Sequence, residues 1–250
     1  MILKQGYLSS GVSNFDFLER HKLRRYDNPN EPLVMFGCYN TQDYNIVKNH
    51  KSELIIRWCG KDSLNVNDIS IFKNKNIIHV TPLPKVCKLL IYKNIDCKLI
   101  KPFLLENPKP LLKGDKIYAY LNRNDPNYYG KLIVDELKKK YSFTIGDLSI
   151  PQKDWPRISD SYYSQSYIGL ALSNFAGGGG GIVEMGLRGI KVVTNVISLP
   201  NTIPWKNIDD IEKAVQEEKY KINTIDTELS NKVKMVMNPN NEGFMYEIIE

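Results

Sequence analysis

The sequence contains no long apolar run. Lys, Asn or Asp interrupts every hydrophobic stretch before it reaches the roughly 18 to 20 residues that a membrane-spanning helix needs. The first residues, MILKQGYLSSGVSNFDF, include no apolar segment of signal-peptide length. Neither a membrane span nor a secretory route is expected, and the sequence predicts a soluble, cytoplasmic protein.

Cysteine and histidine are also scarce. The four cysteines are Cys38, Cys59, Cys87 and Cys97. They form no C-x-x-C pair and are too sparse for a disulfide-stapled secreted module, so we expect reduced thiols. The three histidines are His21, His50 and His79. None of them pairs with another at helical spacing, and a zinc site is not expected.

Charge of either sign is dispersed along the chain. The 250 residues include 34 Lys+Arg and 28 Asp+Glu, which leaves a formal net charge of +6. The one triple basic run, at residues 138–140, is typical of a solvated helix end rather than of a nucleic-acid patch. Hydrophobic residues make up 42% and charged residues 25%, which excludes a disordered chain, collagen and a coiled coil.

Short β-rich runs recur through the first half of the chain. They cover residues 33–36, 53–58, 77–81 and 97–100, and residues 85–92 have a helical pattern. Because each run is brief, apolar and followed by turn residues, we expect parallel strands that alternate with helices. Ligands of open α/β sheets bind at the loops that follow the carboxyl ends of such strands.

Three prolines mark the expected domain boundary: Pro102, Pro108 and Pro110. The sequence predicts one α/β domain over residues 1–110 and a second over residues 111–250. The second is expected to open with a strand at 116–121, a helix that begins at Pro126 with Asp125 as its N-cap, and a strand at 142–145. The expected apolar face of that helix consists of Tyr129, Leu132, Ile133, Leu137 and Tyr141.

Further elements are expected as a helix at 159–165, a strand at 167–172, a helix at 182–188, a strand at 191–194 and a helix at 229–237. The most informative stretch is SNFAGGGGGIVEMGLRGIKVVTN at residues 173–195, which includes the expected helix at 182–188 and strand at 191–194. Glycines ahead of a helix let backbone N–H groups approach an anion closely, and the helix dipole favours negative charge there. The run lacks the Gly-Lys-Ser/Thr of a Walker loop and the third glycine of a dinucleotide fingerprint. Glu184, one turn into the helix, could accept both hydroxyls of a ribose, and Gly189 is expected as the C-cap.

This segment resembles the nucleotide-sugar-dependent glycosyltransferases of the GT-B architecture, which have two Rossmann-like domains facing each other across a cleft. The resemblance is strongest over residues 114–215. It rests on KIYAYLNRND, DWPRISDSYYSQSYIGLALS, the glycine run with IVEMGLRGIKVVTN, and IPWKNIDDIEKAV. The resemblance implies that the second domain binds a nucleotide-diphosphate sugar and that the first domain binds the acceptor.

The resemblance also implies roles for individual residues of the second domain. Glu184 would hold the ribose, and Arg123 would stabilise the departing diphosphate. The other expected donor-binding residues are Asn122, Tyr163, Gly177, Gly178, Gly179, Gly180 and Gly181. Trp155 and Tyr162 could stack on the base or could simply pack in the core, and Asn195 could face the donor. Arg123 could equally be a solvated loop cation.

In the first domain, Asp62 is the leading candidate for the base that deprotonates the acceptor hydroxyl, although it could be a turn residue that bonds its own backbone. The expected acceptor-side residues are Tyr39, Asn40, Asp43 and Lys61, with Asp43 and His50 as further base candidates. No D-x-D motif occurs in the chain, so we expect transfer without a metal and without a cofactor other than the sugar donor. Ala176 replaces the first carboxylate of the E-x7-E pair of retaining members, which leaves the stereochemistry open.

Other functions stay open on the sequence alone. A nucleotide- or glycan-binding module that has lost catalysis would explain Ala176 and the uninterrupted glycines. A transferase that acts on a modified DNA base would use the basic charge. A sugar-nucleotide epimerase is less favoured, because the three histidines lie in the first half. Heavy use of Asn, Lys and Ile suggests an AT-rich genome, viral or bacterial.

Overall fold

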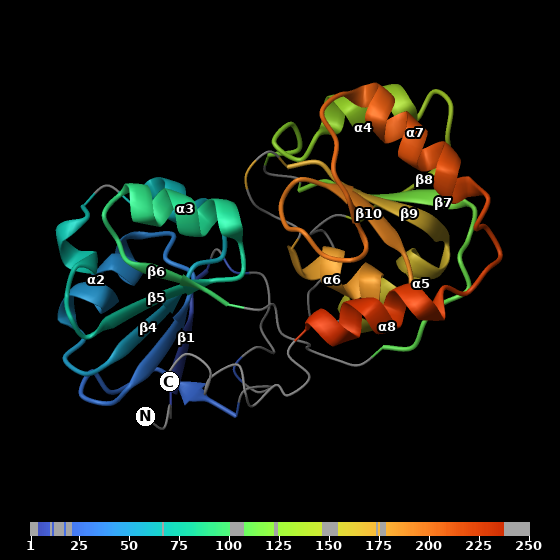
Figure 1. Cartoon of the computed structure of the whole chain (residues 1–250). Helices are drawn as coiled ribbons and strands as arrows, with labels where there is room; N and C mark the ends of the chain where they lie inside the picture. Colours follow the sequence, from blue (N-terminus) through green and yellow to red (C-terminus); the bar gives the residue numbers. More distant parts are fainter. Residues whose placement is uncertain are drawn as a thin grey trace. The chain divides into compact units, whose positions relative to one another are not determined.

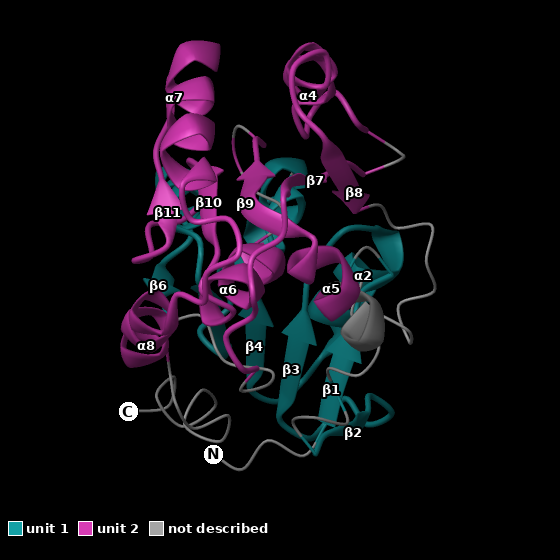
Figure 2. Ribbon diagram, turned by 90° about the vertical axis from the view of Figure 1, so that its right-hand side faces the viewer, with its two compact units in different colours: residues 1–105, 238–250 teal, residues 106–237 magenta. Residues whose placement is uncertain are grey.

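The structure is a computed structural model. It describes residues 5–10, 12, 18, 22–66, 68–100, 108–122, 125–146, 155–173, 175 and 179–237, with the side chains of residues 155–159 left out. The described chain divides into two units, one over residues 5–100 and one over residues 108–237 (Figure 2).

Unit 1 contains a six-stranded parallel sheet with the order β2-β1-β3-β4-β5-β6. Its strands are β1 (Gln5–Leu8), β2 (Arg24–Arg25), β3 (Leu33–Phe36), β4 (Leu54–Arg57), β5 (Ile77–Thr81) and β6 (Cys97–Leu99). Its α-helices are α2 (Thr41–Asn49) and α3 (Pro84–Tyr92), and its 3-10 helices are η1 (Lys61–Asn65) and η2 (Ser70–Phe72). Strands β3 and β4 are apolar along their buried lengths, as expected of a parallel sheet covered on both faces.

Unit 2 contains a five-stranded parallel sheet with the order β11-β10-β9-β7-β8. Its strands are β7 (Lys116–Tyr120), β8 (Phe143–Gly146), β9 (Ser166–Ala171), β10 (Lys191–Thr194) and β11 (Thr202–Ile203). Its helices are α4 (Lys131–Leu137), α5 (Trp155–Ser164), α6 (Gly179–Leu187), α7 (Ile208–Lys219) and α8 (Thr227–Val236).

Helices cover both faces of the unit 2 sheet. Figure 1 shows α4 and α7 on one face and α5, α6 and α8 on the other. The α4 and α7 face buries Val134, Leu137, Ile211 and Val215 against the strands in one apolar cluster. Burial of this kind, at about 25 cal/mol per Å² of apolar surface, is the main stabilising contribution to such a layer. The predicted α/β class with two Rossmann-like units is confirmed.

Three predictions for the first helix of unit 2 are wrong: its start at Pro126, its N-cap at Asp125 and the burial of Leu132. Residues 126–130 form turns, so α4 begins at Lys131 rather than at Pro126. The cause is Gly130, which has a left-handed φ of 82° and packs so closely on Leu172 that a side chain there would clash. Asp125 accepts a hydrogen bond from the Tyr128 amide at 3.3 Å and caps the turn instead of the helix. Leu132, expected on the apolar face, is 75% exposed.

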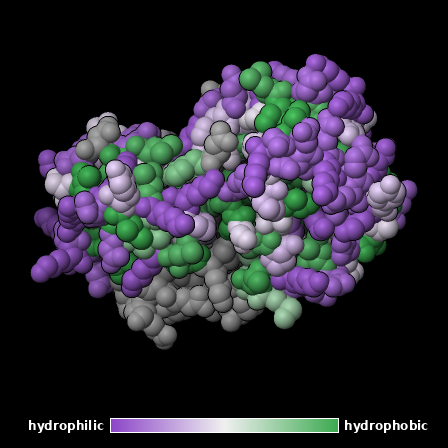
Figure 3. Space-filling model, turned by 45° about the horizontal axis from the view of Figure 1, so that its top comes forward, coloured by the Kyte–Doolittle hydropathy of each residue, from purple (hydrophilic) through white to green (hydrophobic). Residues whose placement is uncertain are grey.

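Polar residues lie on the outer sides of the helices. Helix α7, for example, buries Ile211, Ala214 and Val215, and its N-terminus is closed by a capping box between Asn207 and Asp210. On the face of the molecule drawn in Figure 3, hydrophilic residues predominate and apolar residues form small groups between them. None of the described helices has the length and apolar composition of a membrane span.

Candidate functional site

The strand order of unit 2 reverses between β7 and β9, the two neighbouring strands at the middle of the sheet. The chain leaves β7 toward α4 on one face and leaves β9 toward α6 on the opposite face (Figure 1). Divergent loops of this kind open a crevice at the carboxyl ends of the strands, where ligands of open α/β sheets bind. Of the described residues, Gly179, Gly180, Gly181 and Glu184 lie at this switch point.

Helix α6 begins within the glycine run. Gly179, Gly180 and Gly181 form its first turn, so the prediction that all five glycines form a loop is wrong for these three. Gly177 and Gly178 lie outside the described residues. A side chain at Gly180 would meet no atom within 4 Å, whereas one at Gly181 would lie 3.4 Å from the Tyr163 hydroxyl. The first turn of α6 is therefore open for the close approach of a ligand.

Glu184 lies further along α6 and is half-buried. The Tyr163 hydroxyl on α5 donates a hydrogen bond to Glu184 Oε2 at 3.0 Å. Tyr163 itself is fully buried, and burial together with the Glu184 charge raises the pKa of its phenol well above the ordinary value. The phenol is therefore a neutral donor that orients the carboxylate. Tyr163 has no exposed face for stacking on a nucleobase.

Arg188 completes this cluster and was missed by the sequence analysis. Its guanidinium lies over the Tyr163 ring, 5.3 Å from the centroid, and its Nη1 donates to the Glu184 carbonyl at 3.0 Å. Its Nε donates to Asp160 Oδ1 at 2.7 Å. The ring of Tyr118, on β7, meets Tyr163 edge to face at 5.1 Å. The four-residue spacing from Glu184 was the available signal for Arg188, because such positions share a helix face.

The other donor-side predictions lie on several elements. Asn122, just after β7, forms a hydrogen bond with the Tyr129 phenol. Arg123 lies outside the described residues, as do the side chain of Trp155 and His21. Tyr162 is half-buried on α5. Asn195 donates to the Trp205 carbonyl at 2.7 Å and accepts from the Trp205 amide at 3.2 Å, so its side chain closes the loop after β10.

In unit 1 the strand order reverses between β1 and β3, and Asp43 lies at this point. Its buried carboxylate accepts hydrogen bonds from the Tyr7 hydroxyl at 2.8 Å and the Ser9 hydroxyl at 2.6 Å. It also accepts from the backbone amides of Tyr39 and Asn40, and the bond from Asn40 completes the capping box of α2. Asp43 thus ties the end of β1 to the loop that follows β3.

Asp62 connects the loop that follows β3 to the loop that follows β4. Its carboxylate accepts hydrogen bonds from the backbone amide of Cys38 after β3 and from those of Cys59, Gly60 and Ser63 after β4, at 2.7 to 3.2 Å. Burial raises the pKa of Asp62 to about 6, against the opposing effect of these amides. Its side chain has no exposed surface, whereas a general base must come within hydrogen-bond reach of the proton it accepts.

The remaining acceptor-side predictions divide between the two edges of the unit 1 sheet. Tyr39, Asn40 and Lys61 are half-buried in the loops at the carboxyl edge, beside the two aspartates. His50 follows α2 and precedes β4, which places it at the amino edge, away from those loops. Among the described residues, no group of three or more His, Cys, Asp or Glu side chains is arranged to hold a metal ion.

The two units, each a parallel sheet with loops gathered at its carboxyl edge, have the fold of the GT-B class. Sucrose-phosphate synthase from Thermosynechococcus elongatus superposes with a TM-score of 0.60 and 11% sequence identity, over 87% of this chain and 72% of that chain. TarM superposes with a TM-score of 0.56 and 15% identity, over 89% of this chain and 55% of that chain. The chain therefore spans about half the length of TarM. No protein-family model and no curated protein matches the sequence.

Proposed function

We propose that the chain transfers a sugar from a nucleotide-diphosphate donor to an acceptor hydroxyl, with the donor bound by unit 2. The observation that carries the proposal is the start of α6 at the switch point of the unit 2 sheet, where open glycines precede a carboxylate oriented by a buried tyrosine. Both structural neighbours are glycosyltransferases, which supports the same reaction class.

The first turn of α6 suits the diphosphate. The amides of Gly179, Gly180 and Gly181 have no intrahelical partners in the first turn of a helix, and the dipole places partial positive charge there. The absence of side chains lets the phosphate oxygens approach the backbone. Glu184, one turn later, would accept hydrogen bonds from the ribose hydroxyls, and a nucleotide sugar has these groups in the same order.

Transfer breaks the bond between the anomeric carbon and the diphosphate oxygen and forms a bond to the acceptor oxygen, whose proton passes to the leaving diphosphate or to water. The charge that develops on the leaving diphosphate is stabilised by the α6 amides and, by the resemblance, by Arg123. In unit 1, Asp62 and Asp43 hold three loops at the carboxyl edge, so we propose that they position the acceptor-side residues Tyr39, Asn40 and Lys61. We propose that no metal is needed, because the chain has no D-x-D motif.

The proposal is tested with a panel of nucleotide-diphosphate sugars, with EDTA present, on the wild type and on Glu184→Gln. Thermal stabilisation and slow hydrolysis of one donor are expected for the wild type, with both effects lost or strongly reduced in the variant. The matched control is Glu217→Gln, which removes an exposed carboxylate from the same unit. If no donor stabilises the wild type, the donor-site assignment is wrong.

A second candidate is a nucleotide- or glycan-binding module without catalysis. The burial of Asp62, the leading candidate for the base, favours it. This alternative predicts that a donor stabilises the wild type but is not hydrolysed and is not transferred to any hydroxyl acceptor in a panel of saccharides. Release of the nucleoside diphosphate is expected of a transferase and not of a binding module, so its measurement distinguishes the two functions.

A further inference from the structure

Unit 1 contains a pocket of about 410 Å³ at the amino edge of its sheet, which is the edge opposite to the carboxyl-edge loops. Its walls are the turn that leads into β5 and the turn between α3 and β6, so it lies at the amino ends of the last two strands. Phe72 and Ile95, both 2% exposed, are part of its apolar lining, together with the half-buried Ile77 and Ile78. This volume is within the range of small-molecule sites.

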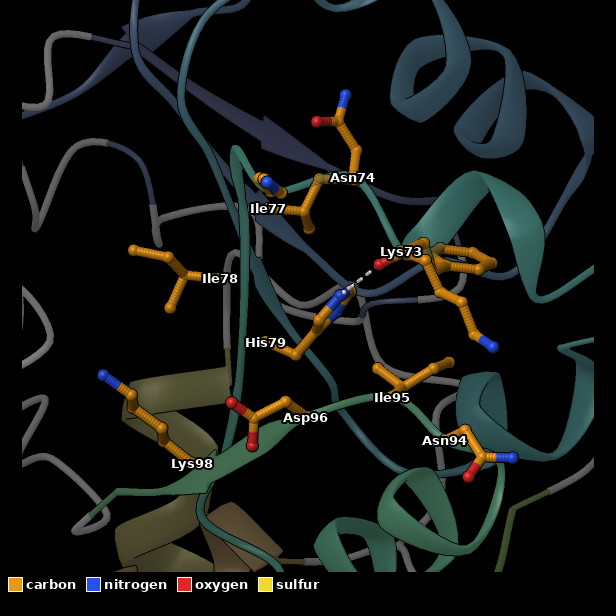
Figure 4. Close-up of a pocket in the computed structure, with 11 residues that line it drawn as sticks. Lys73, Asn74, Ile77, Ile78, His79, Asn94, Ile95, Asp96 and Lys98 are labelled. Carbon is orange, nitrogen blue, oxygen red and sulfur yellow. Dashed lines mark hydrogen bonds between the residues drawn. The ribbon is translucent and has the colours of Figure 1, made fainter.

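The rim of the pocket is basic. Lys73 and Lys75 belong to the first turn and Lys98 to β6, whereas Asp96 is the one acidic residue of the lining. Figure 4 shows Lys73 and Lys98 on opposite sides of His79, with Asp96 on the side of Lys98. Three ammonium groups and one carboxylate give the rim an excess of positive charge, to which an anion is attracted.

His79 does not add to this charge. Its Nδ1 accepts a hydrogen bond from Trp58 Nε1 at 3.2 Å, so the proton is on Nε2 and is donated to the Phe72 carbonyl at 2.8 Å. Burial lowers the pKa of His79, which keeps the ring neutral. His79 therefore connects β5 to the end of η2 at the floor of the pocket. Because its ring is neutral, the charged group of a ligand would be bound by the lysines.

Many lysines of the described chain form ion pairs with carboxylates, and the lysines of the rim differ from them in this respect. In unit 2, Lys140, Lys191 and Lys232 form ion pairs with carboxylates at 2.6 to 2.8 Å. Within the part of the chain that the structure describes, no carboxylate lies within 4.0 Å of the ammonium groups of Lys73, Lys75 or Lys98. The fold therefore leaves an excess of cationic groups around an apolar floor.

The geometry points to a second binding site, for an anionic saccharide unit. A phosphate or carboxylate group would bind a lysine at one end of the rim, Lys73 or Lys98, whose side chains point away from each other in Figure 4. The hydroxyls would bind Asp96 and the exposed amides of Asn74 and Asn94. The apolar face of the sugar ring would lie on Ile77 or on Ile78, which project from opposite faces of β5. A neutral sugar lacks the charged group, and a simple inorganic anion lacks the ring, so the site favours a ligand that has both.

This site is distinct from the proposed reaction. The pocket reaches only the first three residues of β5, Ile77, Ile78 and His79, whereas the carboxyl-edge loops follow the ends of the strands. The pocket contains none of the residues assigned above to donor or acceptor binding. A failure of the pocket proposal therefore leaves the transfer reaction untouched, and the reverse is also true.

The test is calorimetric titration of the full chain with glucose 6-phosphate, glucuronate and glucose, at low and at high salt. The pocket variant is Lys73→Ala with Lys98→Ala, and the matched control is Lys51→Ala with Lys88→Ala, which removes the same charge from exposed positions of unit 1 outside the pocket. Circular dichroism confirms that each variant is folded. The phosphate and the carboxylate arms distinguish the two sources of negative charge.

We expect one or both anionic sugars to bind with a Kd below about 1 mM, weaker at high salt, and glucose to bind at least tenfold more weakly. The pocket variant should raise the Kd at least about tenfold, because the charge-assisted hydrogen bond to the anionic group is lost, and the control should change it less than about twofold. Absence of binding, equal affinity for glucose, an unchanged Kd in the pocket variant or an equal loss in the control would each overturn the proposal.

Discussion

At the scale of single residues, Tyr163 connects the core of unit 2 to the candidate donor site. Its ring packs against Tyr118 and beneath Arg188, and its hydroxyl reaches Glu184. Because the phenol is buried, its position is determined by packing rather than by solvent. A carboxylate held in this way loses less conformational freedom when a ligand binds, which favours affinity.

Tyr163→Phe should keep the packing and remove the hydrogen bond to Glu184. We expect the free energy of unfolding to fall by about 1 kcal/mol and donor affinity to fall about fivefold to tenfold. Turnover of the bound donor should change little, because Tyr163 does not contact the reacting atoms. Calorimetry, thermal unfolding and single-turnover kinetics measure the three quantities.

The control for this variant is Tyr220→Phe, in which a 91% exposed phenol of the same unit loses its hydroxyl. Donor affinity should be unchanged there. Equal affinities of Tyr163→Phe and the wild type would contradict the positioning role.

Asp62 makes a prediction about pH. Its pKa is raised by burial to about 6 from an ordinary value of 3.8, so the folded chain keeps a proton that the unfolded chain has already lost. Stability from this group is therefore greatest below the ordinary value and is lost as the pH rises toward 6. Relative to Asp62→Asn, the wild type should lose about 1.4 kcal/mol of unfolding free energy per pH unit in this interval. Urea titrations between the two pH values measure the difference.

A flat difference between the wild type and Asp62→Asn over this interval would mean that the amide donors outweigh burial and keep Asp62 ionised. Asp68→Asn is the control, because its carboxyl group is exposed and its pKa is lowered rather than raised. Its titration should not reproduce the slope expected for Asp62.

Individual side chains were only partly predictable from the sequence. Glu184 and Tyr163 were both predicted in the donor site, and the structure joins them by a hydrogen bond. The hydrogen bonds of Asp62 to the amides of Cys59, Gly60 and Ser63 agree with the alternative of a turn residue that bonds its own backbone. The bond of Asp62 to Cys38 and those of Asp43 to two hydroxyls could not be foreseen, because these partners lie 24 to 36 residues away in the chain. Such partners leave no local pattern.

At the scale of elements, α6 combines two kinds of glycine. Gly180 faces open space, whereas a side chain at Gly186 would come within 2.5 Å of the Asn201 side chain. Asn201 donates to the Ile182 carbonyl at 2.9 Å, so the close approach at Gly186 fastens the helix to the loop before β11. The first glycine thus serves ligand access and the second serves packing.

The two glycines should respond in opposite ways to alanine. Gly180→Ala should raise the free energy of unfolding by about 0.5 to 1 kcal/mol, because alanine loses less backbone entropy in a helix, and should weaken donor binding by at least about tenfold. Gly186→Ala should lower the free energy of unfolding by about 1 to 3 kcal/mol through overpacking. Chemical denaturation and donor titration measure both effects.

Unchanged donor affinity in Gly180→Ala would show that the ligand does not approach the first turn of α6. Stabilisation by Gly186→Ala would contradict the packing shown between α6 and Asn201.

Elements with strong local signals were predicted well. The strands at 33–36, 77–81 and 191–194 have the predicted bounds, since each is a short apolar run between turn residues. Strand β1 was missed because its four residues include Gln5 and Gly6, and only the tertiary contacts of Gln5 with the 28–31 turn explain its burial. The start of α4 was missed because Gly130 is fixed by Leu172, which is distant in sequence.

At the scale of the whole molecule, both units follow the same plan. In each, the first strand lies between the second and the third, and all pairs are parallel. This order places a switch point beside the first strand of each sheet, and Asp43 of unit 1 and Glu184 of unit 2 lie there. Alternating strands and helices predicted parallel sheets, but the order of the strands depends on contacts between distant segments that periodicity does not encode.

If donor binding belongs to unit 2 alone, residues 106–237 should fold and bind the donor without unit 1. The unit has its own sheet and its own apolar cluster, which supports independent folding. We expect a cooperative thermal transition and a Kd for the donor within about tenfold of that of the full chain. A folded fragment with no affinity for a donor that the full chain binds would contradict this assignment.

The central claim is that Glu184 binds the ribose of a nucleotide donor at the start of α6. The most direct test is a double cycle of Kd values, in which the nucleoside diphosphate of the donor and its 2′,3′-dideoxy analogue are titrated into the wild type and into Glu184→Gln. We expect the wild type to lose at least about tenfold in affinity when the hydroxyls are removed, and Glu184→Gln to lose about twofold or less. Equal losses in the two proteins would contradict the central claim.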